Sequence, residues 1–115
     1  MPYCSITSNV AMTDERKRPF LRELSSAIAQ LTGKPESYVM VEFVEQPNML
    51  FAGSDDPLCM VAMKSLGLPE ERTKEFSSEL SQLVQRELGI GADRCYIEFA
   101  APKRHMWGFN GTTFG

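Results

Sequence analysis

The sequence has few of the residues that metal sites and disulfides need. Its 115 residues include one histidine, His105, and three cysteines, Cys4, Cys59 and Cys95. No two cysteines lie close in sequence, and neither a Cys-x-x-Cys pair nor a Cys/His ligand spacing occurs. We therefore expect reduced, buried thiols and a protein that uses no metal and no cofactor.

Long apolar runs and long runs of one charge are also absent. No segment approaches the roughly 18 apolar residues of a membrane helix, and no basic region followed by an apolar core opens the chain. We therefore expect a cytoplasmic protein without a membrane partner. Secretion by a route that needs no signal peptide is left open. The net charge is −3 and no basic run of five or more residues occurs, although Arg16-Lys17-Arg18 is a short cluster, so nucleic-acid binding is not expected.

A proline directly follows the start methionine. If Met1 is removed, Pro2 becomes a secondary amine that can accept a proton. An α-amino group titrates near ~8, and both burial and a neighbouring cation lower such a pKa. An amine that is neutral near pH 7 can act as a general base. The alternative is that Pro2 only stiffens the start of a strand.

Two amphipathic helices are predicted. Pro19 suits a first helical turn, so the first helix is expected to begin there and to end at Gly33. Pro69 is expected to open the second helix, which ends at Gly89. The apolar residues recur at helical spacing in both segments: Phe20, Leu21, Leu24, Ala27, Ile28 and Leu31, then Phe76, Leu80, Leu83, Val84 and Leu88.

Four strands are predicted around these helices, at 3–9, 38–44, 58–66 and 94–101, with a loop at 46–57 and a mixed tail from 102. The order is β-α-β twice. From the first helix onward the halves match without gaps at a constant offset of 56 positions, which relates Phe20 to Phe76 and Gly33 to Gly89. We interpret residues 1–115 as one domain with an internal repeat, roughly 2–45 and 58–101.

Two such units predict an α+β fold, with a four-stranded sheet and both helices on one of its faces. The strands read as nearly continuous apolar runs, as in Val39-Met40-Val41 and Cys59–Met63. Because no third helix is available for the second face, we expect other subunits to cover it in a homo-oligomer.

Several short motifs accompany this pattern. They are Met1-Pro2, Thr32-Gly33-Lys34-Pro35, Phe51-Ala52-Gly53-Ser54, Ser65-Leu66-Gly67, Asp93-Arg94-Cys95-Tyr96-Ile97 and the tail Asn110-Gly111-Thr112-Thr113-Phe114. Together they resemble the macrophage migration inhibitory factor family, which includes D-dopachrome tautomerase, within the tautomerase superfamily. The resemblance covers the whole chain. It implies a homotrimer with active sites between subunits. It also implies an enzyme that tautomerises α-keto acids such as phenylpyruvate and isomerises dopachrome-type compounds. The animal members of this family are also secreted cytokines.

The resemblance also implies roles for individual residues. Pro2 is the expected catalytic base, and Lys34 is expected to hold the substrate carboxylate and to repel a protonated amine. The alternative for Lys34 is a cation that stabilises a helix C-terminus. The remaining substrate-binding candidates are Ser65 and Leu66 at the pocket wall, Tyr38, Trp107 and Phe114 along an aromatic slot, and Tyr96 and Glu98 from the neighbouring subunit. For the apolar residues, core packing is the alternative.

The sequence departs from the family pattern at three places. Leu58-Cys59-Met60-Val61 stands where the family has Cys-x-x-Cys, so thiol–disulfide exchange of that kind is not expected. Glu98 stands where the family has an asparagine, and a carboxylate accepts hydrogen bonds without donating them. Phe109 replaces the family's tail tryptophan, while Trp107 stands where a smaller residue is common.

Three functions stay open on the sequence. The first is a cofactor-free tautomerase for small enolisable α-keto acids. The second is a cytokine-like or host-modulating binding protein with a vestigial pocket, whose receptor the sequence does not identify. The third is an enzyme whose natural substrate differs from phenylpyruvate, which the carboxylate of Glu98 favours.

Overall fold

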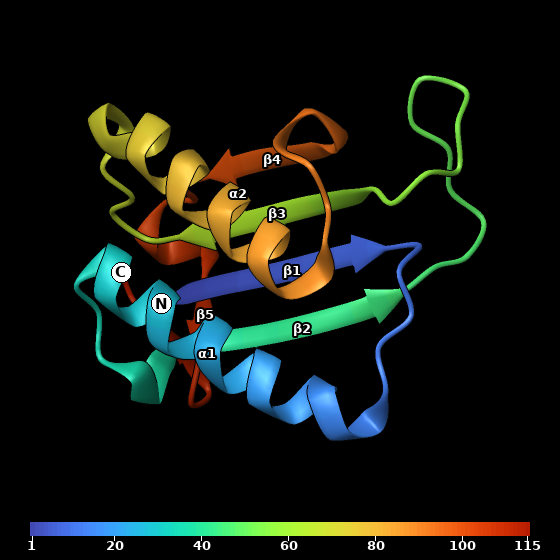
Figure 1. Cartoon of the computed structure of the whole chain (residues 1–115). Helices are drawn as coiled ribbons and strands as arrows, with labels where there is room; N and C mark the ends of the chain where they lie inside the picture. Colours follow the sequence, from blue (N-terminus) through green and yellow to red (C-terminus); the bar gives the residue numbers. More distant parts are fainter.

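The computed structural model describes all 115 residues and confirms the predicted α+β fold. Strands β1 (Pro2–Ser8), β2 (Met40–Glu45), β3 (Cys59–Ser65) and β4 (Cys95–Ala100) form one sheet in the order β2-β1-β3-β4. The central pair β1–β3 is antiparallel, and the outer pairs β1–β2 and β3–β4 are parallel. Helices α1 (Asp14–Thr32) and α2 (Thr73–Leu88) cover the same face of the sheet (Figure 1).

The core lies between this face and the helices. Phe20, Leu24 and Ile28 of α1 are buried, as are Phe76 and Leu80 of α2. They pack on alternate residues of the two central strands, of which Cys4, Ile6, Val61 and Met63 are fully buried. Residue burial alternates in β1, β3 and β4.

The strands therefore alternate more cleanly than their sequences suggest. The face of the sheet that the helices leave uncovered is called the open face here. Hydrophobic residues such as Met40 and Met60 occupy open-face positions, so the period of two is hidden in the sequence. The open face is mixed rather than apolar: it carries Ser5, Glu42 and Glu98 beside them.

Helix α1 begins five residues before the predicted Pro19. The backbone N–H groups of Arg16 and Lys17 donate to the carbonyl of Thr13, which starts the helix. Proline costs a helix one hydrogen bond and crowds the carbonyl four residues earlier. Here that carbonyl belongs to Glu15, in the first, exposed turn, where it can tilt toward water.

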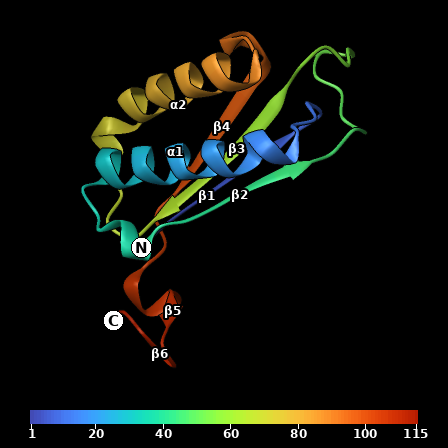
Figure 2. The same cartoon turned by 60° about the horizontal axis from the view of Figure 1, so that its bottom comes forward.

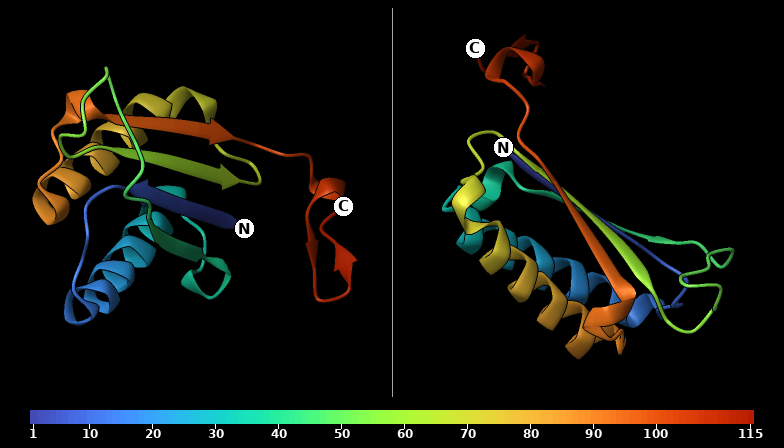
Figure 3. Two further views of the ribbon diagram at one scale, coloured as in Figure 1. Left: turned by 90° about the vertical axis from the view of Figure 1, so that its right-hand side faces the viewer. Right: turned by 90° about the horizontal axis from the view of Figure 1, so that it is seen from above.

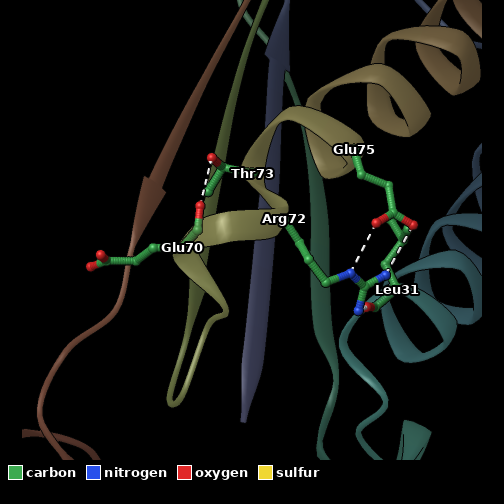
Figure 4. Close-up of polar contacts among 5 residues, drawn as sticks. All are labelled: Leu31, Glu70, Arg72, Thr73 and Glu75. Carbon is green, nitrogen blue, oxygen red and sulfur yellow. Dashed lines mark hydrogen bonds and ion pairs between the residues drawn. The ribbon is translucent and has the colours of Figure 1, made fainter.

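Helix α2 also begins differently from the prediction. Pro69 precedes a short 3-10 turn, Glu70–Arg72, and the α-helix proper starts at Thr73. Arg72 forms two hydrogen bonds with Glu75, at 2.9 and 3.0 Å, and a third with the carbonyl of Leu31, at 3.2 Å (Figure 4). Arg72 thereby joins the start of α2 to the last turn of α1.

The two halves share the way each helix ends and the turn that follows it, as well as the order of their elements. Both helices end at a glycine in the left-handed conformation, Gly33 (φ 68°) and Gly89 (φ 69°), where side chains other than glycine are strained. A 3-10 turn follows in each half, Glu36–Tyr38 and Ala92–Arg94. The turns keep the offset of 56. Because Tyr38 closes the first of them, β2 starts at Met40 rather than at Tyr38.

The two ends of the sheet carry different connections. The β2–β3 loop, residues 46–58, extends from the end farthest from the N-terminus (Figure 1). From the other end residues 102–115 project away from the sheet and helices (Figures 2 and 3). This segment contains a 3-10 turn, Arg104–Met106, and a hairpin of β5 (Gly108–Phe109) and β6 (Thr112–Thr113). Neither helix has the length and apolarity needed to cross a membrane.

Candidate functional site

A pocket of about 630 Å³ lies where the start of β1 meets the C-terminal segment. Its wall is largely apolar, and Lys64 is its only charged side chain. Such a pocket, with few polar groups, is typical of small-molecule sites. The lining residues come from the chain start (Met1, Pro2, Tyr3), the β2 entrance (Ser37, Tyr38, Val39, Met40), β3 (Lys64) and the C-terminal segment (Pro102, Met106, Trp107, Gly108, Phe109, Phe114).

Pro2 contributes the first residue of β1 and is fully buried. Its partner across the antiparallel ladder is Ser65, at the end of β3. Ser65 and Leu66 are also buried, and the Ser65 hydroxyl donates to the carbonyl of Leu66, at 3.2 Å. Ser65 and Leu66 therefore form the floor behind Pro2 rather than the lining surface of the pocket.

Lys34 approaches this corner from the end of α1. A Cβ atom placed on Gly67 would lie 3.9 Å from the Lys34 Nζ atom, so the ammonium sits against the Ser65–Gly67 turn. Lys34 also acts on the chain start: burial and, second, the positive charge of Lys34 hold the pKa of the Met1 amine below its usual value. Lys34 thus lies beside the pocket, close enough to bias an amine in it.

The aromatic candidates form one wall. The ring of Tyr38 meets Phe109 edge-on at 5.5 Å between centroids and Phe114 at 6.4 Å. Phe109 and Phe114 stack at 5.7 Å with an interplanar angle of 12°. The backbone N–H of Phe114 donates to the carbonyl of Trp107, which ties the tail together. The structure therefore brings together Pro2, Tyr38, Trp107 and Phe114, as the sequence predicted.

Tyr96 and Glu98 do not belong to this pocket within one chain. Tyr96 is 65% exposed and contacts the Phe51 ring at 4.7 Å, at the far end of the sheet. It lines a separate apolar pocket of about 240 Å³, formed with the β2–β3 loop. Glu98 lies on the open face between these two ends. Their expected role requires a second subunit.

The predicted site did not include several residues of the pocket, among them Tyr3, Met40 and Lys64. All three lie on the open face, and Tyr3 pairs with both others across the sheet. Strict alternation outward from Ser65 would have placed Lys64 there. The β5–β6 hairpin was not predicted either. Its two-residue turn is Asn110-Gly111, and both residues have positive φ.

The fold and this pocket define a small α+β domain with a largely apolar, aromatic pocket at the start of its first strand. The family model for "Macrophage migration inhibitory factor (MIF)" matches residues 1–115. A macrophage migration inhibitory factor homolog from Brugia malayi is 37% identical, with full coverage of both chains, and the mouse macrophage migration inhibitory factor is 33% identical, with 99% of each chain covered.

Solved structures agree with these sequence matches. A macrophage migration inhibitory factor homologue from Prochlorococcus marinus is 40% identical, with a TM-score of 0.92 over 98% of this chain and 99% of that one. The homologue from Toxoplasma gondii is 31% identical, with a TM-score of 0.90 over 97% and 99%. The chain belongs to the macrophage migration inhibitory factor family, within the tautomerase superfamily.

Proposed function

We propose that the protein is a cofactor-free keto–enol tautomerase of small α-keto acids such as phenylpyruvate, with Pro2 as its general base after removal of Met1. Dopachrome-type isomerisation is the related activity of the same site. The observation that carries the proposal is the meeting of a buried N-terminal proline, a lysine and an aromatic wall at one pocket.

The electrostatics support a neutral amine at Pro2. Burial and Lys34 already lower the pKa of the amine at Met1. The Pro2 position is more deeply buried than Met1, so we expect both effects to act on an amine at that position as well. Neutral Pro2 takes a proton from the carbon next to the keto group, and the protonated amine returns that proton to the oxygen. The carbon–hydrogen bond breaks, the enol O–H forms, and no redox change occurs.

Lys34 has a double role in this mechanism. Its charge attracts the substrate carboxylate and, by the same field, disfavours the protonated amine. The aromatic wall of Tyr38, Phe109 and Phe114 binds a substrate ring. Positioning and a matched base supply several orders of magnitude of rate enhancement without a metal.

We further propose that the active form is a homotrimer in which a neighbour contributes Tyr96 and Glu98. The open sheet face exposes Met40 (65%), Val44 and Tyr96, and residues 102–115 project from the body of one chain. Both features suit contacts between subunits. Sedimentation equilibrium tests this assembly, and a monomer at micromolar concentration would contradict it.

Turnover of phenylpyruvate, followed by ultraviolet absorbance, tests the enzyme proposal. The sample is protein whose N-terminus mass spectrometry identifies as Pro2. Pro2→Gly is expected to lower kcat/KM by about 10²- to 10³-fold, and a Met1-retained form to be inactive because its Pro2 nitrogen is an amide. No turnover in the correctly processed protein would contradict the proposal.

A cytokine-like binding role is the second candidate. It rests on the relatives named macrophage migration inhibitory factor in animals and parasitic worms. An intact, active pocket favours the enzyme, whereas a processed protein without turnover would favour binding.

A further inference from the structure

Lys64 is the one charged side chain that lines the pocket, and it has no assigned role. In β3 it directly precedes Ser65, and burial alternates along this strand, so Lys64 points to the open face while Ser65 points to the core. Lys34 reaches the same corner from the helix side, at the Ser65–Gly67 turn. Two cations therefore approach the start of β1 from opposite faces of the sheet.

The ammonium of Lys64 is free to bind a ligand. It takes part in no ion pair, and its one close partner is the Tyr3 ring, 5.8 Å from Nζ to the centroid. The nearby Glu42 accepts a hydrogen bond from the Tyr3 hydroxyl at 2.8 Å instead. Glu98 occupies the open face two residues before Ala100, the ladder partner of Lys64, and does not pair with it.

Within one chain the remaining pocket lining contains no acidic residue, so a substrate whose first carboxylate lies near Lys34 leaves Lys64 without a counter-ion from its own chain. In the proposed trimer the neighbour adds one carboxylate, Glu98, and the binding test below decides whether Glu98 or the ligand neutralises Lys64. Lys64 is exposed in one chain, and its positive charge on a largely apolar wall attracts an anionic group of the ligand. The aromatic residues of the wall would shield the uncharged part of such a ligand from solvent.

We propose that Lys64 forms a second anion subsite, and that the preferred substrate class is α-keto acids, or their enols, that carry a second anionic group on the ring or side chain. The proposal rests on the proposed tautomerase function for its chemistry. It differs in what it requires of the ligand, namely two negative charges placed at separate points.

Binding tests this independently of turnover. The ligands are 3-phenylpropanoate, with one carboxylate, and 3-(4-carboxyphenyl)propanoate, with two. Neither can enolise as a keto acid does. Trp107 is the only tryptophan and lines the pocket, so its fluorescence reports occupancy. In processed wild-type protein the two-carboxylate ligand is expected to bind about tenfold more tightly.

Three variants sharpen the test. Lys64→Met keeps the stem and removes the charge, so the tenfold preference should disappear, whereas Lys64→Arg should keep it. Lys74→Met removes an exposed lysine of α2 outside the pocket and is the matched control; its preference should stay unchanged. Equal weakening of both ligands by Lys64→Met, or no preference in the wild type, would overturn the proposal.

Turnover then separates the two proposals. With phenylpyruvate and 4-carboxyphenylpyruvate as substrates, Lys64→Met should lower kcat/KM for the second substrate about tenfold more than for the first. Turnover of phenylpyruvate without any preference would overturn the Lys64 subsite and leave the tautomerase standing. Charge-selective binding without turnover would leave the subsite standing and remove the tautomerase.

Discussion

The same turn joins helix to strand in each half of the chain, and the two copies have different tasks. In the first half Gly33 is followed by Lys34 and by the turn Glu36–Tyr38, which faces the pocket. In the second half Gly89 is followed by Ile90, which is fully buried, and by Ala92–Arg94. At the offset of 56, Lys34 corresponds to Ile90 and Tyr38 to Arg94.

Arg94 serves the structure where Tyr38 serves the pocket. Its guanidinium donates to the backbone carbonyls of Phe51, Ser54, Asp56 and Pro57, at 2.9 to 3.1 Å. It also stacks over the Phe51 ring, 5.2 Å from its centroid. These contacts hold the β2–β3 loop on the end of the sheet. The repeated unit thus supplies the frame, and the residues that differ between its copies decide which end becomes a site.

Replacing a residue of one copy by its counterpart in the other should cost the most stability at position 90. Ile90→Lys places an ammonium in the core without a partner, and we expect a loss of about 3–5 kcal/mol in the free energy of unfolding. Urea denaturation measures it. Ile90→Val, the control, should cost about 0.5–1.5 kcal/mol. A folded Ile90→Lys variant of near wild-type stability would contradict the assigned core position.

Removing the contacts between Arg94 and the β2–β3 loop, which act as a clamp, should have the next largest effect on stability. Arg94→Met deletes the hydrogen bonds to the loop carbonyls, partly replaced by water, and should lower the free energy of unfolding by about 2–3 kcal/mol. Hydrogen exchange should accelerate at Phe51 and Ser54, whose amides close the loop turn. Arg94→Lys keeps the charge but not the planar fork, so it should restore only part of the loss. Unchanged exchange in Arg94→Met would refute the clamp.

The cysteines give the smallest and most local contrast between the halves. In the first half Cys4 is alone, and burial raises the pKa of its thiol to about 12. In the second half Cys59 and Cys95 are partners across the ladder. The Cys59 thiol donates to Cys95, which lowers the pKa of Cys95, while this bond and burial raise that of Cys59.

Alkylation of the folded protein should follow these pKa values. Because the thiolate is the nucleophile, iodoacetamide should modify Cys95 before Cys4 and Cys59 at neutral pH. Cys59→Ala removes the donor and should slow Cys95, whereas Cys59→Ser keeps a donor and should not. Peptide mass spectrometry resolves the sites. Faster reaction at Cys4 than at Cys95 would contradict this order.

Local patterns predicted the fold well because each element carries its own signal. The helical spacing of Phe20, Leu24 and Ile28 and the terminal glycines determine the helices, and the repeat determines the order. The start of α1 was missed because Pro19 is tolerated where the carbonyl of Glu15 is exposed. Lys64 was missed for another reason: strand alternation places it on the open face, but its place in the pocket depends on the ladder register with Tyr3.

The site was predictable only in part. Pro2, Tyr38, Trp107 and Phe114 meet within one chain, as the resemblance implied. Tyr96 and Glu98 lie away from this pocket in one chain, and their proposed role requires contacts between subunits. The motif Asp93–Ile97 proved to contain a structural residue, Arg94, beside a candidate site residue, Tyr96.

The most direct test of the account is the pKa of the Pro2 amine in the processed protein, measured by NMR with ¹⁵N-labelled proline and compared with the pH profile of kcat/KM for phenylpyruvate. The base must be neutral, so activity should fall as the pH drops through that pKa. We predict that both measurements give one pKa below that of an ordinary secondary amine, and that Lys34→Met shifts both to higher pH. An unshifted amine pKa, or an acidic limb that does not follow it, would contradict the role of Pro2 as the base.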